Sequence, residues 1–390
     1  MLLCTMGGLA IFSSTMAKNP ALPLFVRSMG ASTSTVGFIA AASTIVGVVV
    51  SLPAGILSDL IGRRRVILAS MFVFATAPFL YLLVASPWQL VLVRLYHGLA
   101  TAILGPVAMA AVADTFDARR GERLAWYSSA TMIGRFLAPS VGGLLIIGQD
   151  FRWVYLADGL AGVMALLAAL RLPAVANHSS DATHPKRQNR REGIGTDLVA
   201  LFRNGPLLAT SLMEAGQYFA FGMVEVYLPI YLNERVGLAA WQIGPLFTAQ
   251  ILVTTLSKPL TGRLSDRMGR VPFIALGLLL DAALMALMPQ TTSYLLLLVL
   301  TAGFGLALAM VTASTSAFVA DLSRHTSRGA GFGVLSSIMD VGHSAGPMVG
   351  GLLIAAFGYQ AAFASVAAIL VVVATAYWWR LRTPTRAPTV

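Results

Sequence analysis

GILSDLIGR at residues 55–63 recurs as GRLSDRMGR at residues 262–270, an offset of 207 residues. Val112-Ala113-Asp114 returns as Val319-Ala320-Asp321 at the same offset. The segment Ala138–Gly143 returns as Gly346–Gly351, one residue further along. One offset shared by separate places indicates a chain built from two related halves.

Both halves have the composition of a membrane protein. Hydrophobic residues make up 57% of the 390 residues and charged residues only 11%, whereas soluble domains carry roughly 25% charged residues. Apolar runs such as 36–57, 66–85 and 295–319 reach the ~20 residues that a helix needs to cross a bilayer. The sequence therefore predicts an all-α membrane protein with twelve transmembrane helices in two pseudo-symmetric six-helix bundles.

Turn signals and charges divide these apolar runs into individual helices. We expect helices at about residues 2–27, 33–57, 66–85, 88–113, 123–148 and 153–172, and again at 206–232, 240–262, 271–289, 292–319, 328–355 and 358–380. The resulting domains are an N-terminal bundle (1–172), a polar cytoplasmic linker (173–205), a C-terminal bundle (206–380) and a cytoplasmic tail (381–390). Parallel repeats of this kind predict a substrate path between the halves, near the middle of the bilayer.

The net charge of +11 does not indicate a nucleic-acid partner, because the Lys and Arg residues lie in short segments between apolar runs. Most of the 27 basic residues fall on one side if both termini are cytoplasmic, as the positive-inside rule requires. We expect a multi-pass protein of a bacterial inner membrane. Cys4 is the single cysteine, so no intrachain disulfide can form, and the five histidines lack the spacing of metal ligands.

The repeated loop segments resemble the signature motif of the major facilitator superfamily, Gly-x-Leu-Ser/Ala-Asp-Arg-x-Gly-Arg, although Leu60 replaces the usual Arg in the first copy. The resemblance implies a conformational latch, in which Asp59 meets the helix that starts near Arg328, and Asp266 meets the helix that starts near Arg123. The motif residues of the two copies are Gly55, Asp59, Gly62 and Arg63, and Gly262, Asp266, Arg267, Gly269 and Arg270. A simple positive-inside turn is the alternative role for this motif.

Two further segments resemble motifs of the same family. Arg94-Leu95-Tyr96-His97-Gly98 matches Arg-x-x-Gln-Gly with His97 at the Gln position, and Arg94, His97 and Thr101 share one helical face. The family motif Gly-x-x-x-Gly-Pro-x-x-Gly-Gly, associated with antiporters, is matched twice. Its residues here are Gly134, Pro139, Gly142 and Gly143, with Ala138 in place of one Gly, and Gly346, Pro347, Gly350 and Gly351. Close helix packing alone is the alternative role.

Ionisable residues inside the predicted helices are the candidates for binding and coupling, since such residues are costly in a membrane. Glu214 is the preferred proton-coupling carboxylate, and Asp340, Glu225 and His343 are further candidates. The substrate-cavity candidates are Lys18, Asn19, Arg94, His97, Thr101, Arg135, Gln217 and Tyr218. A charge pair between Arg135 and Asp340 is plausible, and we assign Asp158 and Asp281 to packing.

No ATP-binding loop, hydrolase nucleophile motif or metal cluster is evident, so we expect a secondary transporter rather than an enzyme. We expect a proton gradient as the energy source and no cofactor. The resemblance favours export of small amphipathic or cationic molecules such as drugs, in exchange for protons, by a monomer. The alternatives are proton-coupled transport of a sugar, organic acid or amino acid, sodium coupling, and a membrane scaffold that transports nothing.

Overall fold

The computed structural model describes residues 1–115, 120–172, 205–322 and 328–382. These ranges are almost entirely helical and contain no β-strand beyond an isolated bridge between Ile147 and Asp150. The expected linker and tail lie outside the described residues, apart from their margins.

The N-terminal half contains α1 (Leu2–Lys18), α2 (Ala21–Ser28), α3 (Thr33–Ile61), α4 (Arg63–Tyr81), α5 (Pro87–Thr115), α6 (Arg120–Leu145) and α7 (Arg152–Leu170). The sequence predicted a single bent helix at residues 2–27. The chain instead leaves the helix at Asn19 and resumes it after Pro20, because proline lacks the N–H that would continue the hydrogen-bond ladder. Asn19 is thereby extended and leaves a gap between α1 and α2.

The C-terminal half contains α9 (Gly205–Tyr231), the π-helix η2 (Leu232–Val236), α10 (Ala240–Met268), α11 (Arg270–Leu287), the 3-10 helix η3 (Met288–Gln290), α12 (Tyr294–Leu322) and α13 (Arg328–Arg382). The two last predicted helices run together as α13, which bends where Gly358 takes a φ of 79°. With α1 and α2 as one broken segment and α13 as two, the described residues give the expected twelve segments.

Seven helices in the described ranges meet both the length and the apolar composition of a membrane span: Thr33–Ser51, Arg63–Tyr81, Pro87–Thr115, Arg152–Leu170, Arg270–Gln290, Tyr294–Leu322 and Gly333–Arg380. The last of these covers 48 residues, enough for two crossings at ~20 residues each. The remaining segments fall short because α1 is interrupted and because α6, α9 and α10 contain more polar side chains. Helices that line a polar path need such side chains.

The chain forms two compact units. Unit 1 comprises residues 1–182, 223–248 and 347–355, and unit 2 comprises residues 183–222, 249–346 and 356–390. Unit 1 therefore joins the N-terminal half to parts of α9, α10 and α13.

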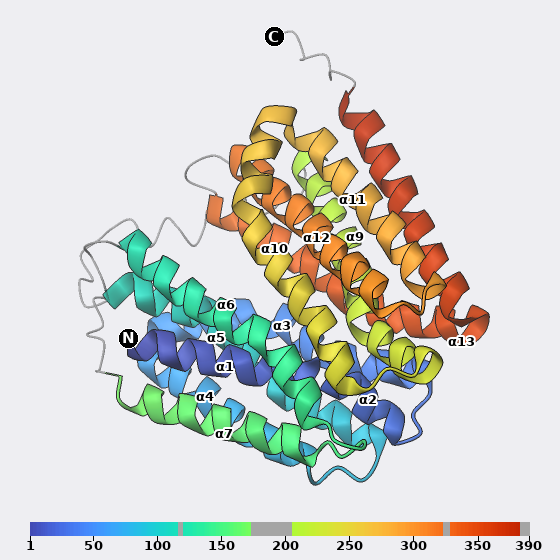
Figure 1. Ribbon diagram of the computed structural model, residues 1–390. Coiled ribbons are helices and arrows are strands. Elements are labelled where there is room, and N and C mark those ends of the chain that lie inside the picture. The colour runs from blue at the N-terminus through green and yellow to red at the C-terminus, as the bar shows by residue number, and fades with distance from the viewer. Residues whose placement is uncertain (116–119, 173–204, 323–327, 383–390) are drawn as a thin grey trace, which may run out of the picture. The chain divides into compact units, whose positions relative to one another are not determined.

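In unit 1, α1 packs against α6 and α7, while α4 packs against α5 and α7 (Figure 1). The apolar core between α1, α4, α5 and α7 includes Met6, Phe74, Leu104 and Ala165. In unit 2, α11 packs against α12, where Gly277 leaves room for Val311. Small residues bring these helices close together, as in other membrane proteins.

Candidate functional site

Glu214 lies on α9 in unit 2 and is 4% exposed. The hydroxyl of Thr315, on α12, donates a hydrogen bond to its Oε2. Thr315 is itself fixed, because its hydroxyl also reaches the Val311 carbonyl at 3.0 Å. The positive charge of Lys258, on α10, also acts on Glu214. Three helices thus converge on one buried carboxylate, and no sequence pattern indicated that Thr315 is its partner.

Three aromatic rings cluster in the same unit. Tyr218 and Phe221 follow Glu214 on α9 by four and seven residues and so lie on its side of the helix. Their ring centroids are 5.8 Å apart, and His343 of α13 lies 5.8 Å from Tyr218 and 5.5 Å from Phe221. Aromatic faces attract organic cations, so α9 presents rings and a carboxylate along one side.

Gln217 and Asp281 form a second buried polar group in unit 2. Both are fully buried, and Gln217, on α9, lies beside Asp281, on α11. The sequence assigned Gln217 to the substrate cavity, but the residue has no exposed surface here. Asp281 is the acid that the sequence assigned to packing.

Lys18 and Glu225 meet in unit 1, where Lys18 Nζ lies 2.9 Å from Glu225 Oε2. The sequence had given these residues separate roles, one in the cavity and one in proton coupling. Glu225 and Glu214 both stand on α9 but belong to different compact units. Asn19, beside Lys18, is 4% exposed at the break between α1 and α2.

Arg94 and His97 are buried on α5. Arg94 donates to the Ser43 hydroxyl and to the Ala40 carbonyl at 3.4 Å, both on α3. His97 Nδ1 lies 3.4 Å from the Tyr81 hydroxyl. Thr101, predicted on the same face, is exposed at the helix surface and its hydroxyl donates to the Gly98 carbonyl at 3.0 Å. The predicted polar face is therefore divided between a buried part and an exposed part.

Asp158 of α7 adds a buried carboxylate to unit 1. It has no exposed surface, and Ser13 of α1 lies next to it. Nearby, the rings of Tyr81 and Tyr155 stack with centroids 4.5 Å apart. This group joins three helices, and the packing role that the sequence analysis assigned to Asp158 stays a prediction.

The two copies of the loop motif have the same geometry. Arg63 forms ion pairs with Asp59 and with Asp114, the latter at 3.1 Å, and donates to the Ser58 hydroxyl. The equivalent contacts of the second copy, each 207 residues further on, join Arg270 to Asp266, to Asp321 at 3.3 Å and to Ser265 at 2.8 Å. Sequence reasoning missed the roles of Asp114 and Asp321, although the Val-Ala-Asp repeat marked both positions.

Each copy also turns at a glycine. Gly62, between α3 and α4, has a φ of 100°, and Gly269, between α10 and α11, has a φ of 91°. These values suit glycine because a side chain is strained there. Arg267 is exposed. The latch contacts with Arg123 and Arg328 stay predictions, since the Arg328 side chain lies outside the described residues and Arg123 and Asp266 belong to different units.

The glycines of the antiporter-like motif lie at close helix contacts. A Cβ at Gly134 would overlap the Gly8 carbonyl oxygen, and one at Gly142 would lie 3.0 Å from the Met16 side chain. In the second copy, a Cβ at Gly350 would lie 2.8 Å from Met223. Close packing is therefore one role of both motifs. Arg135 is exposed in unit 1 and Asp340 is half-buried in unit 2, so their predicted pair stays a prediction.

A chain of two repeated sets of apolar helices, with buried ionisable groups in both compact units, has the character of a polytopic membrane transporter. The sequence profile described as Major Facilitator Superfamily matches residues 3–247 and 210–390. The chain belongs to this superfamily and is a transporter of small molecules, not an enzyme.

Named relatives and solved structures resemble the chain over most of its length. Multidrug resistance protein 1 of Bacillus subtilis is 23% identical over 92% of this chain and 91% of that protein. Multidrug resistance protein MdtG of Escherichia coli is 25% identical over 96% and 91%. A bacterial homologue of the human lysosomal transporter Spinster, with 16% identity, covers 100% of this chain and 98% of its own with a TM-score of 0.84. The nucleoside transporter NupG gives a TM-score of 0.82 at 16% identity, over 97% and 99%.

Proposed function

We propose that this protein exports small amphipathic or cationic molecules, such as drugs, in exchange for protons. The observation that carries the proposal is the buried carboxylate of Glu214, hydrogen-bonded to Thr315 and followed on the same helix by Tyr218 and Phe221. The multidrug resistance relatives support the same substrate class.

A carboxylate beside aromatic rings suits a cation with an apolar body. The rings attract the cation by their π-faces and cover apolar groups, while the carboxylate supplies a full opposite charge. Glu214 has little access to water, so its charge needs a neutralising partner inside the membrane, and either a proton or the substrate cation can supply it. Competition between the two for one carboxylate is the simplest route to exchange.

Alternating access turns this competition into transport. The carboxylate loaded with a proton and the carboxylate paired with a cation are both neutral, and only neutral forms cross between the two conformations readily. A proton gradient then drives the cation in the opposite direction. We further propose that the chain acts as a monomer in a bacterial inner membrane. Its basic segments support an orientation with both termini in the cytoplasm.

The test uses purified protein in liposomes that carry a pH-sensitive dye and hold a proton gradient. A panel of cationic dyes, sugars and organic acids is added in turn. We expect the cations alone to dissipate the gradient, and we expect Glu214→Gln to abolish this response while the protein still reaches the liposomes.

Asp150→Asn is the matched control. Asp150 lies in the other unit, where its carboxylate accepts a hydrogen bond from the Arg152 backbone N–H at 2.9 Å, and the same acid-to-amide change there leaves proton movement at the wild-type rate. Cation-driven proton movement that persists in Glu214→Gln would overturn the assignment. A response to sugars or organic acids alone would replace the substrate class.

A further inference from the structure

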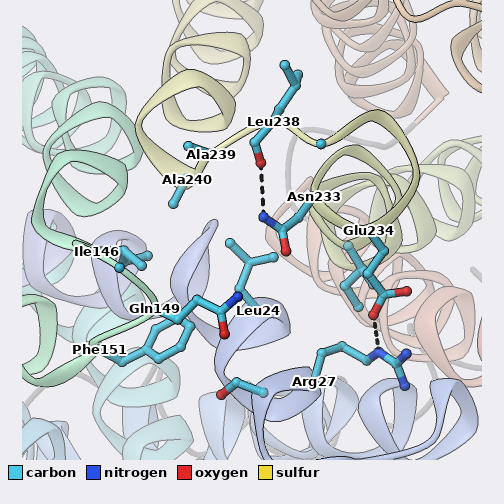
Figure 2. A pocket seen from close by; sticks show the side chains of 14 residues that line it. Leu24, Arg27, Ile146, Gln149, Phe151, Asn233, Glu234, Leu238, Ala239 and Ala240 are labelled. Carbon is cyan, nitrogen blue, oxygen red and sulfur yellow. Dashed lines mark hydrogen bonds and ion pairs between the residues drawn. The ribbon is translucent and has the colours of Figure 1, made fainter.

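Two ion pairs in unit 1 join residues that are equivalent in the internal repeat. Lys18 pairs with Glu225 at 2.9 Å, and Arg27 Nε pairs with Glu234 Oε1 at 2.7 Å (Figure 2). In both pairs the partners are 207 residues apart, as the second bond shows directly, and this is the offset of the repeated loop motif. Each of these residues therefore pairs with the residue at the equivalent position of the other half.

Positions related by a rotation can touch each other only close to the rotation axis. Two identical charged side chains would repel each other there. Because the halves have diverged in sequence, the first copy carries Lys18 and Arg27 and the second carries Glu225 and Glu234, and repulsion has become attraction. Both pairs therefore lie near the axis that relates the halves.

The same part of unit 1 is packed by equivalent glycine contacts. A Cβ at Gly143 would overlap the Ala240 carbonyl oxygen, and one at Gly351 would lie 2.7 Å from the Thr33 carbonyl oxygen. Thr33 and Ala240 are again 207 residues apart and begin α3 and α10. The Tyr227 hydroxyl adds contacts of 2.8 Å to the Thr33 and Pro347 carbonyls.

A cavity of about 460 Å³ lies beside the outer of these two pairs (Figure 2). Arg27 and Glu234 line it, together with Leu24, Ile230 and Ala240. Ile230 lies between Glu225 and Glu234 in the sequence and is fully buried. Lys18 and Glu225 are more enclosed than Arg27 and Glu234, with side-chain exposures of 24% and 12% against 29% and 33%.

We infer that the two pairs form a two-level gate on the pseudo-symmetry axis, with Lys18–Glu225 as the inner level and Arg27–Glu234 as the outer level. The gate is closed when both pairs are made, and it must break them to admit or release substrate at this end of the protein. Because the paired positions are equivalent, the gate has no required polarity, and each pair can form with its charges exchanged. At position 27 the exchange also removes the hydrogen bond from Arg27 to the Ala31 carbonyl. The inference rests on membership of the transporter family and not on the proposed drug substrate.

The experiment measures how fast a maleimide reagent reaches a cysteine behind the outer pair. Ile230→Cys is made in a Cys4→Ser background, and the purified protein is labelled in lipid nanodiscs. Arg27→Glu places two acids together. Loss of one exposed ion pair raises the population of the open gate about five-fold, so we expect the labelling rate to rise by the same factor. Arg27→Glu combined with Glu234→Arg re-forms the ion pair and returns the labelling rate most of the way to that of the wild type, since only the Arg27 bond to the Ala31 carbonyl stays lost.

The inner pair is tested in the same way, with Lys18→Glu alone and with Lys18→Glu combined with Glu225→Lys. Arg235→Glu is the matched control. Arg235 is the exposed neighbour of Glu234 and has no ion pair among the described residues, so its reversal leaves labelling unchanged.

Exchanged pairs that label as fast as the single reversals would overturn the gate, and so would single reversals that label no faster than the Arg235→Glu control. If the charge reversal at half-buried Lys18 prevents folding, the more exposed pair of Arg27 and Glu234 decides the question by itself. Labelling requires no substrate, so it stays informative even if the transport assay rejects drug export.

Discussion

Arg63 is bonded to three side chains at the edge of the N-terminal half, and its removal gives a prediction of defined size. The partners are Asp59 and Asp114, whose side chains are 48% and 45% exposed, and the buried Ser58. Ion pairs exposed to this degree contribute about 0.2–1 kcal/mol each. The hydrogen bond from a charged guanidinium to a buried hydroxyl contributes about 1.5–3 kcal/mol. Since contributions of neighbours are not additive, we expect Arg63→Ala to lower the free energy of unfolding by about 2–3 kcal/mol.

The repeat makes this prediction stricter. Arg270 has the equivalent three partners. We therefore expect Arg270→Ala to lower the free energy of unfolding by the same amount as Arg63→Ala, to within about 0.5 kcal/mol. Arg63→Lys should recover less than half of the loss, because an ammonium cannot reproduce the planar fork of a guanidinium.

The measurement is unfolding of detergent-purified variants by denaturant, with Arg65→Ala as the control. Arg65 is exposed and donates a bond of 3.4 Å to the Ile61 carbonyl, so its loss should be nearly neutral. A double-mutant cycle with Arg63→Ala and Asp114→Asn isolates the Arg63–Asp114 ion pair, and we expect a coupling free energy of about 0.5–1 kcal/mol. The reasoning is refuted if Arg63→Ala costs no more than Arg65→Ala, or if the Arg63 and Arg270 variants differ by more than about 1.5 kcal/mol.

Three further outcomes are expected. Ser43→Ala removes a hydroxyl that accepts from buried Arg94 and should cost about 1.5–3 kcal/mol in the same unfolding assay; a neutral result would show that the bond does not stabilise the fold. Gly244→Val forces a side chain against the Pro139 carbonyl and should cost about 1–3 kcal/mol, whereas an unchanged stability would mean that the helices separate freely. Thr315→Val should slow cation-driven proton movement in liposomes, and wild-type rates would exclude Thr315 as a functional partner of the carboxylate.

The helical segments and their duplication were predictable from the sequence. An apolar run of membrane length must be helical, because lipid offers no partner for a free backbone N–H or C=O. The turns at Gly62 and Gly269 were marked by the repeated motif, whereas the break of the first segment at Pro20 was predicted only as a bend within one helix. The run of α13 through Gly358 was not predicted, because a glycine between two apolar stretches also suits a loop.

The partners of the buried polar groups were mostly beyond the sequence. Glu214 was chosen as a coupling acid from its position, but nothing along the chain connected it to Thr315, 101 residues away. Lys18 and Glu225 were assigned separate functions although both stood at equivalent repeat positions. The repeat offset of 207 residues shows that the two positions are equivalent, but only the 2.9 Å distance between their side chains places them near the pseudo-symmetry axis.

The division follows from the forces involved. Hydropathy, turn residues and an internal repeat act along the chain, so the sequence determined how many segments this transporter has and approximately where they lie. Which side chains meet depends on how each helix is rotated about its axis and how closely its small residues allow a neighbour to approach. Contacts such as Arg27 with Glu234, or Gly351 with the Thr33 carbonyl, are set by those two quantities, and only the tertiary structure decided them.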